Sequence, residues 1–598
     1  MHRGETLRYV AGLLVFAAAW TAVGNEAVGD WPTYRGDSHR SGITSESVKL
    51  PLVERWAMEA PHPPRPAWPE MPARLDVYRN VKLGPTVVFD RAPHVVVEGD
   101  SLYYGSTADD AVRCLDVSTG KTRWSFTTEG PVRLAPTIAG GRVYVGSDDG
   151  LVYCLAAGDG QLLWKHRAGP EDRRLPGNGR MISLWPVRCG VVVDGGVVYV
   201  CAGLFPSQGA YLCALKAEDG KELWKRQVDI SAQGYLLASP DRLFVPTGRT
   251  PPHIYQRADG EQVAAFPGIG QQRSGAPEGG GCFAVLVDDQ LMHDAGEKGG
   301  IQVTDARSRE KIISSSGLRV IARGSVAYIL REDRLSALDR ARHVELVRLE
   351  QKKEKSPEDE KRIEELGKTH LKWEAPCSAP YELIMAGETI FVGGEEKVVA
   401  FHAADGKELW TGGVTGKAYS LAASGGRLFV STDKGTVHCF EHEAATASLP
   451  SSAVQILPKI TAGQASSGTQ IAEGLLFQPA AKDDLTPLYE RAADLAVHSA
   501  GVTKGYCLVL GANTGRLAYE IAVRSEFQVV GIEPDAGKVA EARKRLAEAG
   551  LYGNRVVIHH GSLDKLPYQK RTATRIVSDA TRVTGKLPPS AAEVYRLL

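Results

Sequence analysis

The chain of 598 residues has no excess of charge, few cysteines and, after its first two dozen residues, no long apolar run. Basic and acidic side chains both number 71, so the sequence lacks the basic surplus of nucleic-acid-binding proteins, and we expect no nucleic-acid partner. Nine cysteines are too few for a disulfide-stabilised scaffold of this length. Sixty-four glycines, by contrast, indicate a globular fold with many tight turns.

The longest apolar run lies at the N-terminus. Residues 9–23 read YVAGLLVFAAAWTAV without a charge and follow Arg3 and Arg8. This run is shorter than the ~20 residues needed to cross a bilayer. We therefore predict that residues 1–24 are a signal peptide and that the protein is exported to the periplasm or the extracellular space, with an uncleaved N-terminal anchor as the alternative. No later segment is apolar enough to span a membrane, so none is expected once the signal is removed.

An internal repeat organises residues 30–443. Four strand–turn–strand copies read VRCLDVSTGKTRW, VYCLAAGDGQLLW, LCALKAEDGKELW and VVAFHAADGKELW, and they end at Trp124, Trp164, Trp224 and Trp410. Thr-Gly and Asp-Gly supply the positive φ that a tight hairpin turn needs. Turn glycines stand at positions 120, 160, 220 and 260, which gives a period of 40 residues with one insertion of 20.

A further apolar strand precedes each hairpin, and these strands define eight units. They begin at Leu102, Arg142, Val197, Arg242, Gln290, Val326, Thr389 and Arg427. A period near 40 with about four short strands is typical of a propeller blade, and such blades bury their faces only by stacking into a ring. We predict an all-β, eight-bladed propeller over residues 30–443. The last unit has no terminal Trp strand, and residues 53–56 are the candidate to supply it.

The motif Asp-x-x-Thr-Gly-Lys-x-x-Trp at residues 116–124 resembles the tryptophan-docking repeat of PQQ-like (quinoprotein) propellers. The opening Trp-Pro-Thr-Tyr-Arg-Gly at residues 31–36 is also similar to the start of exported members. The family's dehydrogenases use a disulfide between adjacent cysteines above the quinone and an acidic group that holds calcium. No two cysteines are adjacent here and no calcium cluster aligns, so we expect neither PQQ nor a metal. The resemblance then implies a scaffold or binding propeller, with a quinoprotein dehydrogenase as the least favoured alternative.

Cysteine shares one repeat position with alanine, which indicates a small buried strand position rather than a metal or redox site. The occupants of that position are Cys114, Cys154, Ala214, Ala400 and Cys439. Cys201 and Cys213 lie in neighbouring predicted strands. The sequence leaves open whether these two cysteines form a disulfide.

Two insertions interrupt the repeat. In the first, residues 177–190, the side chains of Asn178, Arg180, Trp185 and Arg188 form either an anion- or peptide-binding loop or, as we favour, a packed loop between blades. The second, residues 341–372, is dense in charge, and its Ser-Pro pair at 356–357 is typical of a helix start. We predict a protruding helical hairpin here. A protein partner or a small ligand is expected on a propeller face or on this hairpin.

The C-terminal part of the sequence has a different pattern. Residues 444–485 are rich in Ala, Ser, Thr, Gln and Pro, the composition of a linker. Beyond them, predicted strands at 506–510, 528–532 and 555–559 alternate with helices at 516–523 and 536–549. This alternation predicts a parallel, doubly wound α/β (Rossmann-like) sheet. Because the chain ends after a fourth strand, we predict a partial, C-terminally truncated domain over residues 486–598.

This region resembles class I S-adenosylmethionine-dependent methyltransferases. A glycine loop follows the first strand, an acid ends the second strand, and a Gly-Ser pair follows the third. The resemblance implies S-adenosylmethionine as the cofactor, and the residues that it places at the cofactor are Gly511, Ala512, Asn513, Gly515, Glu533, Ser562 and Leu563. Asn513 replaces the family's middle glycine and Ser562 replaces an acid. No catalytic residue is assigned, and the methyl acceptor is left open.

These observations predict an exported propeller scaffold that carries a methyltransferase-like module. An active S-adenosylmethionine-dependent methyltransferase with an accessory propeller is the alternative. Export disfavours that alternative, because a charged cofactor made in the cytoplasm does not cross a bilayer unaided. The fold alone does not discriminate between the scaffold and the active methyltransferase.

Overall fold

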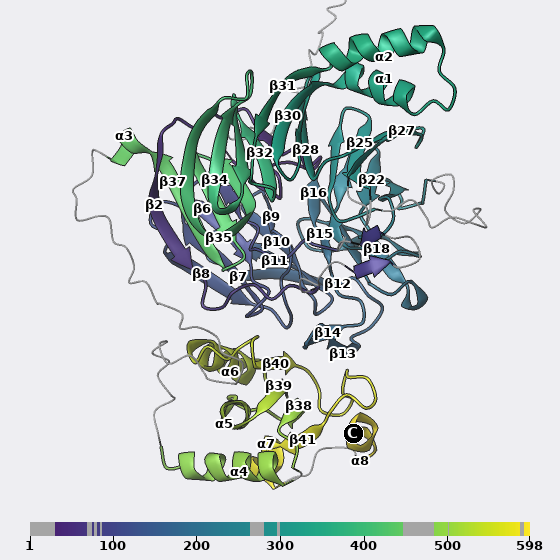
Figure 1. Ribbon diagram of the computed structural model, residues 1–598. Coiled ribbons are helices and arrows are strands. Elements are labelled where there is room, and N and C mark those ends of the chain that lie inside the picture. The colour runs from purple at the N-terminus through teal and green to yellow at the C-terminus, as the bar shows by residue number, and fades with distance from the viewer. Residues whose placement is uncertain are drawn as a thin grey trace, which may run out of the picture.

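The computed structural model describes residues 30–68, 74–76, 81–83, 87–263, 280–295, 300–446, 483–499, 501–585 and 591–598. The predicted signal peptide lies outside these residues, as does nearly all of the predicted linker. The described chain forms a ring of antiparallel sheets and, below it in Figure 1, a smaller domain of helices around a parallel sheet.

The sheets of the ring follow one another along the chain, and their neighbouring strands are antiparallel except for β1 (Ile43–Thr44), which pairs parallel with β32 (Glu382–Ala386). The first three are β5 (Val96–Glu98), β6 (Ser101–Gly105), β7 (Ala111–Asp116) and β8 (Thr122–Thr127); β9 (Thr137–Ala139), β10 (Arg142–Gly146), β11 (Leu151–Ala156) and β12 (Leu162–Arg167); and β16 (Val192–Asp194), β17 (Val197–Ala202), β18 (Ala210–Lys216) and β19 (Glu222–Val228). The next three are β21 (Leu237–Ala238), β22 (Arg242–Val245) and β23 (His253–Gln256); β24 (Ala284–Val287), β25 (Gln290–Asp294), β26 (Ile301–Asp305) and β27 (Lys311–Ser315); and β28 (Arg319–Arg323), β29 (Val326–Leu330), β30 (Arg334–Asp339) and β31 (Leu371–Pro376).

The remaining ring strands form one eight-stranded sheet. Its order is β1 (Ile43–Thr44), β32 (Glu382–Ala386), β33 (Thr389–Gly393), β34 (Glu395–His402), β35 (Glu408–Ser424), β36 (Arg427–Thr432), β37 (Thr436–His442) and β2 (Leu52–Glu59). The long strand β35 pairs with β34 up to Lys417 and with β36 from Ala418 onward, so it belongs to two halves, one of β1 and β32–β35 and one of β35–β37 and β2. β2 pairs antiparallel with β37, which confirms that residues 53–56 supply the missing outer strand of the last unit.

Smaller elements connect these sheets. They are the hairpins β3 (Arg74–Asp76) with β4 (Val81–Leu83) and β13 (Arg174–Gly177) with β14 (Arg180–Ser183), the parallel pair β15 (Cys189–Gly190) with β20 (Gly234–Tyr235), the 3₁₀ turn η1 (Pro206–Gln208) and the short helix α3 (Glu443–Thr446).

Tryptophan side chains join each of several sheets to the next. A Cβ atom added at the turn glycine would lie less than 3.0 Å from the indole that covers it, so only glycine fits under the ring. The pairs are Trp56 on Gly120, Trp124 on Gly160, Trp164 on Gly220, Trp224 on Gly260 and Trp373 on Gly406. Trp373 was not recognised in the sequence, because the helical insertion separates it from the strand with which it pairs.

The segment from Trp31 to Thr44 crosses one end of the ring and hydrogen bonds to the inner strands of many sheets. Backbone hydrogen bonds of 2.8–3.1 Å join Trp31 to Val97, Pro32 to Ile138, Ser38 to Ala238, His39 to Leu286 and Gly42 to Met385. The buried guanidinium groups of Arg35 and Arg40 donate to further strand carbonyls, those of Val320, Leu383, Leu236 and Val191. The segment therefore ties opposite sides of the ring together.

The charge-dense insertion forms two antiparallel helices, α1 (Arg340–Glu350) and α2 (Pro357–Thr369), that project from the outer turn between β30 and β31 (Figure 1). Ser356 caps α2 with a reciprocal capping box. The base of the hairpin is not free of the ring, because Val347 is buried in the cluster of apolar side chains that belongs to β24–β27 and β28–β30.

The C-terminal domain has four parallel strands in the order β40 (Val556–His560), β39 (Glu526–Glu533), β38 (Lys504–Leu510) and β41 (Arg575–Ser578). Its helices are α4 (Thr486–His498), α5 (Arg516–Arg524), α6 (Ala536–Glu548), α7 (Asp579–Thr584) and α8 (Ala591–Leu597). Within the described part of the chain, no helix has the length and apolar character needed to cross a bilayer. All nine cysteines lie in that part and are buried and unpaired, Cys201 and Cys213 included.

Candidate functional site

The predicted glycine loop follows β38 at the carboxyl end of the parallel sheet. Gly511, Asn513 and Gly515 all have positive φ, at 61°, 53° and 80°. Asparagine tolerates this left-handed region better than most other side chains do, which is consistent with Asn513 at a φ of 53°. A Cβ at Gly511 would collide with Ala580 of α7, and one at Gly515 would lie 3.1 Å from Cβ of Ala542 in α6. Close helix packing therefore accounts for both glycines.

Glu533 ends β39 beside this loop and is only 6% exposed. Its Oε2 accepts a hydrogen bond of 2.8 Å from the backbone N–H of Asn513, and its Oε1 accepts one of 3.1 Å from the N–H of Asp535. The N–H of Ala512 donates to the carbonyl of Ile532 at 3.0 Å. The structure thus brings the acid and four of the predicted loop residues together at one edge of the sheet.

Helix α5 begins directly after the loop, with Gly515 as its N-cap and no side chain capping it. The first backbone N–H groups of a helix have no partners within the helix and favour an anion. The loop, this helix start and the Glu533 carboxylate therefore offer donors and acceptors side by side.

The third predicted segment is only partly brought to this edge. The N–H of Gly561 donates to the backbone carbonyl of Glu533 at 3.1 Å. Ser562 is exposed, and among the described residues its hydroxyl hydrogen bonds only to Asp564. Leu563 is half-buried against the core of the domain.

The insertion at 177–190 does not present the side chains that the sequence proposed for a ligand. Arg180 is buried and paired with Asp110 at 2.5 Å, and Arg188 is buried and paired with Asp148 at 2.8–2.9 Å. Trp185 is buried as well, and the amide of Asn178 donates to the carbonyl of Ala67. The binding-loop interpretation is therefore wrong for these side chains, and the packed loop is the correct one.

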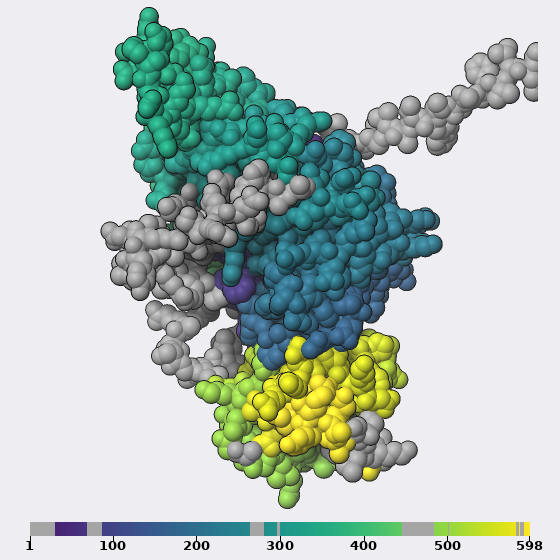
Figure 2. All heavy atoms as spheres, turned by 90° about the vertical axis from the view of Figure 1, so that its right-hand side faces the viewer, coloured from purple at the N-terminus to yellow at the C-terminus, as the bar shows by residue number. Residues whose placement is uncertain are grey.

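The hairpin β13–β14, which includes the start of this insertion, contacts the C-terminal domain, and that domain lies directly against the propeller (Figure 2). The N–H of Arg174 donates to the carbonyl of Pro567 at 2.8 Å, and the N–H of Gln569 donates to the carbonyl of Arg174 at 2.9 Å. The side chain of Met181 is buried within the apolar cluster of the C-terminal domain. Further contacts join Tyr552 Oη to the carbonyl of Thr128, Arg65 to Asn554 and His62 to the carbonyl of Gly550.

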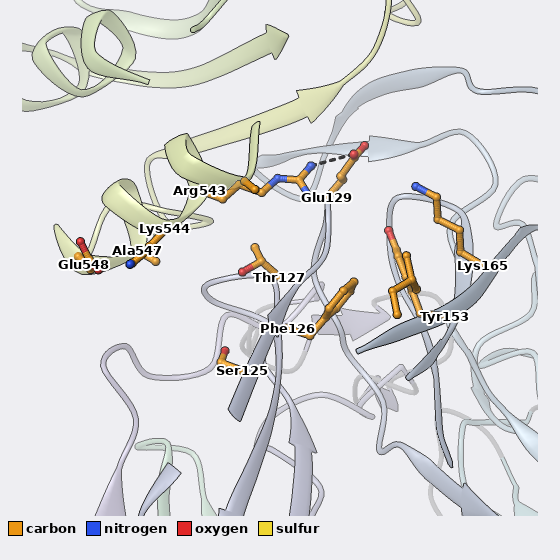
Figure 3. A pocket seen from close by; sticks show the side chains of 12 residues that line it. Ser125, Phe126, Thr127, Glu129, Tyr153, Lys165, Arg543, Lys544, Ala547 and Glu548 are labelled. Carbon is orange, nitrogen blue, oxygen red and sulfur yellow. Dashed lines mark hydrogen bonds and ion pairs between the residues drawn. The ribbon is translucent and has the colours of Figure 1, made fainter. Parts of the chain in front are cut away.

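A buried ionic cluster stands at the centre of this domain contact (Figure 3). Oε2 of Glu129 accepts from Nη2 of Arg174 at 2.6 Å, and Oε1 accepts from Nη2 of Arg543 at 2.8 Å and from the N–H of His560 at 3.2 Å. Burial alone raises the pKa of Glu129, but the positive charges of Arg174 and Arg543 outweigh it and hold that pKa well below its ordinary value. Glu129 is therefore ionised between the two domains.

A pocket of about 510 Å³ adjoins this cluster, between strands β8, β11 and β12 and helix α6. Its residues are Ser125, Phe126, Thr127, Glu129, Tyr153, Leu162, Lys165, Ala540, Arg543, Lys544, Ala547 and Glu548. The sequence analysis identified none of the ionic cluster, because its members belong to no repeat or motif. One signal was available, the spacing of Ala540, Arg543 and Ala547, which marks a second contact face on α6.

The side chain of Tyr34 contacts residues of two different sheets. The Tyr34 ring stacks on Tyr235 with 3.6 Å between ring centroids, and its hydroxyl donates to Glu382, which begins a strand on another side of the ring. Among the described residues, no cluster of histidine, cysteine, aspartate and glutamate is arranged to hold a metal ion.

Fold and site together define a tryptophan-docked β-propeller joined to a methyltransferase domain. A family profile described as "Outer membrane protein assembly factor BamB" matches residues 56–183, 177–271 and 364–539, about two thirds of the chain, so the chain belongs to this PQQ-like propeller family. A second profile, "Methyltransferase domain", matches residues 507–598.

Individual relatives are distant. Outer membrane protein assembly factor BamB of Yersinia pestis is 28% identical over 159 residues, 26% of this chain and 38% of that protein. Polyvinylalcohol dehydrogenase of a Pseudomonas species is 30% identical over 135 residues, 22% of this chain and 19% of that protein. The chain thus spans about a fifth to two fifths of these relatives. Among solved structures, quinohemoprotein alcohol dehydrogenase from Pseudomonas putida HK5 has 13% identity, a TM-score of 0.47 and coverage of 78% of this chain and 85% of its own.

Proposed function

We propose that this protein is an exported propeller scaffold whose C-terminal methyltransferase domain binds S-adenosylmethionine. The observation that carries the proposal is the contact between Glu533 and the backbone of Asn513, which sets an acid beside the glycine loop. Open α/β sheets bind ligands at this carboxyl edge, and a carboxylate there accepts the hydrogen bonds of ribose hydroxyls.

The residues at this edge fit the cofactor. When bound, S-adenosylmethionine supplies an electrophilic methyl group. The uncapped start of α5 offers backbone N–H donors to its carboxylate, whereas the N–H groups of Ala512, Asn513 and Gly515 already donate within the domain. Each oxygen of Glu533 has a further lone pair beyond the one that its backbone hydrogen bond uses. Ser562 and Leu563 would flank the adenine, the latter with an apolar surface.

Equilibrium dialysis of the purified full chain with labelled S-adenosylmethionine tests this proposal. We expect saturable binding that unlabelled S-adenosylhomocysteine displaces, because the two share the ribose, adenine and amino-acid groups. Adenosine alone should compete more weakly, since it cannot use the donors at the helix start. Absence of saturable binding at millimolar cofactor overturns the proposal.

For the ring, we propose eight blades over residues 30–443, with 444–485 as a linker and 486–598 as a doubly wound domain. The division of β35 between two halves of its sheet supports the count, since those halves and the six earlier sheets make eight. An experimental structure with another number of blades would refute it.

We also propose that the propeller binds a protein partner and holds no quinone. Three relatives are named as outer membrane protein assembly factors, and α1–α2 projects an exposed, charged surface. No two cysteines are adjacent in the sequence, and the residues that the structure describes include no cluster of side chains arranged to hold a metal ion. Fluorescence titration with PQQ tests whether the propeller holds a quinone, and quinone-dependent dye reduction would contradict the proposal that it holds none. Site-specific photo-crosslinking from Lys361 of α2 tests whether a protein partner binds there. Glu218 is the control position on the ring.

Export remains part of the proposal through the N-terminal apolar run. Fractionation of cells that make the full chain, with mass spectrometry of the mature N-terminus, tests it. A cytoplasmic protein that retains residues 1–24 would overturn it.

A further inference from the structure

We infer that the propeller positions the adenine-side segment of the methyltransferase domain, residues 560–569, through the carboxylate of Glu129 and the backbone of Arg174. The inference rests on the S-adenosylmethionine site proposed above and assigns its control to the other domain. Glu129 and Arg174 are positioning residues, since neither lies at the proposed cofactor edge.

The first attachment holds the start of this segment. Oε1 of Glu129 accepts the N–H of His560, the last residue of β40, at 3.2 Å. β40 is an edge strand of the parallel sheet, so the hydrogen bond partner for this N–H comes from the propeller. Arg543 of α6 binds the same carboxylate oxygen at 2.8 Å and also donates to the carbonyl of Ile558. Glu129 thus fixes the end of β40 and the helix that covers it.

The second attachment holds the end of the segment. The backbone of Arg174 at the start of β13 bonds to the carbonyl of Pro567 and the N–H of Gln569, as in a short parallel bridge. Tyr568 between them is buried, and its hydroxyl is 2.9 Å from Nδ1 of His559. The propeller therefore forms hydrogen bonds to both ends of the segment that contains Ser562 and Leu563.

The segment is joined in turn to the cofactor loop. Gly561 donates to the backbone carbonyl of Glu533 at 3.1 Å, and the Glu533 carboxylate accepts from the N–H of Asn513 at 2.8 Å. Three hydrogen bonds, joined by the peptide bond between His560 and Gly561 and by the side chain of Glu533, therefore connect Glu129 to the loop. A shift at Glu129 changes the place of the acid that is proposed to bind the ribose.

The buried ion pair between Glu129 and Arg174 makes this attachment depend on the docking of the two domains. Glu129 and Arg174 are both nearly inaccessible to solvent, and Arg174 also pairs with Asp172 at 3.0 Å. Removing one partner of a buried ion pair leaves the other charge uncompensated, which is far more costly than losing an exposed pair. The segment is consequently held firmly only when the two domains are docked with this cluster intact.

The test uses the full chain and two readouts, hydrogen exchange of peptides covering residues 560–569 and the Kd for S-adenosylmethionine. The variants are Glu129→Gln, which keeps one acceptor, Glu129→Ala, which keeps none, and Arg543→Gln, which perturbs the cluster from the other domain. The matched control is Arg65→Gln, which removes a contact to Asn554 in the same interface but away from the segment.

We expect exchange in the segment to rise in the order parent, Gln, Ala, with the Kd of the Ala variant raised about tenfold and that of Arg65→Gln within about twofold. If Glu129 only stabilised the domain interface, Arg65→Gln would raise the segment exchange and the Kd as much as the Glu129 variants do. Unchanged segment exchange in Glu129→Ala, or in Arg543→Gln should the Glu129 variants not fold, overturns the inference. If the parent binds no cofactor, the proposed function fails, while the exchange result still decides whether the propeller positions the segment.

Discussion

The indole of Trp56 covers Gly120, and its Nε1 donates to the carbonyl of Val117 at 2.8 Å. Trp56 belongs to β2, an N-terminal strand that precedes the repeats, and Gly120 belongs to the turn between β7 and β8. Because β2 pairs with β37 from the far end of the ring, this one contact joins the last sheet to the first. Ring closure therefore depends on a strand and a tryptophan that come before the repeats.

We expect Trp56→Ala to destabilise the propeller by about 3–5 kcal/mol, as large aromatic truncations in cores do. The side chain is 9% exposed, and its loss leaves both a cavity and an unpaired carbonyl at Val117. Chemical denaturation followed by tryptophan fluorescence measures the change. Leu163→Ala, at a side chain 44% exposed on β12, is the control and should stay within about 0.5 kcal/mol. A similar effect of both variants would disprove the closure role.

Replacing residues 340–370 with Val-Ser-Thr-Gly-Lys, the sequence of residues 117–121 in the sister turn, should leave a cooperatively folded propeller. β30 and β31 pair with the same bulge, between Ala337 and Leu338, that the sister hairpins show, so their register does not need the helices. The Tm should fall by no more than about 5 °C, because the main apolar side chain lost from the ring is Val347. Differential scanning calorimetry measures it, and loss of a cooperative transition would show that the hairpin is part of the core.

Two substitutions at the cofactor edge should act in opposite directions. Glu533→Ala should raise the Kd for S-adenosylmethionine roughly tenfold or more, since a charged hydrogen-bond acceptor is lost. Asn513→Gly should lower it, because glycine adopts the φ of 53° without strain and frees the space of a side chain. Isothermal titration calorimetry measures both. Glu526→Ala, at the exposed opposite end of β39, is the control. Equal effects of Glu526→Ala and Glu533→Ala would refute the placement of the site.

Acidification below neutral pH should destabilise the propeller through His94. Burial, aided by the charge of Arg319, lowers the pKa of His94 to about 3, whereas an unfolded histidine titrates near ~6.5. The unfolded chain therefore binds a proton that the folded chain does not, so stability is full above ~6.5 and falls as pH drops toward 3. The loss is at most about 1.4 kcal/mol per pH unit for this group.

Urea unfolding of the parent and His94→Gln at about pH 7 and about pH 5 measures this difference. The variant cannot titrate at this position and should lose less stability on acidification. His498→Gln, at an exposed position on α4, should keep the pH dependence of the parent. An identical pH dependence in parent and His94→Gln would refute the assignment to His94.

The recurring features of this protein could be predicted from local sequence. Turn glycines such as Gly160 and tryptophans such as Trp124 recur because each hairpin needs positive φ at one place and an aromatic cover from the preceding sheet. The strand ends at Leu510 and Glu533 could likewise be predicted from the sequence, since the alternation of apolar strands and amphipathic helices is a local pattern. Trp373 was missed because an insertion of two helices hides its place in the repeat.

The sequence by itself therefore determined the repeat, the likeness of each turn to the next and the order of the C-terminal strands, all of which follow from backbone preferences within a few residues. The tertiary structure confirmed the predicted place of residues 53–56 in the last sheet. It alone decided that the segment from Trp31 to Thr44 spans the ring and that Glu129 meets Arg543 and His560. Those contacts join side chains hundreds of residues apart, and their free energy comes from burial and from charge pairing that exist only once both domains have folded.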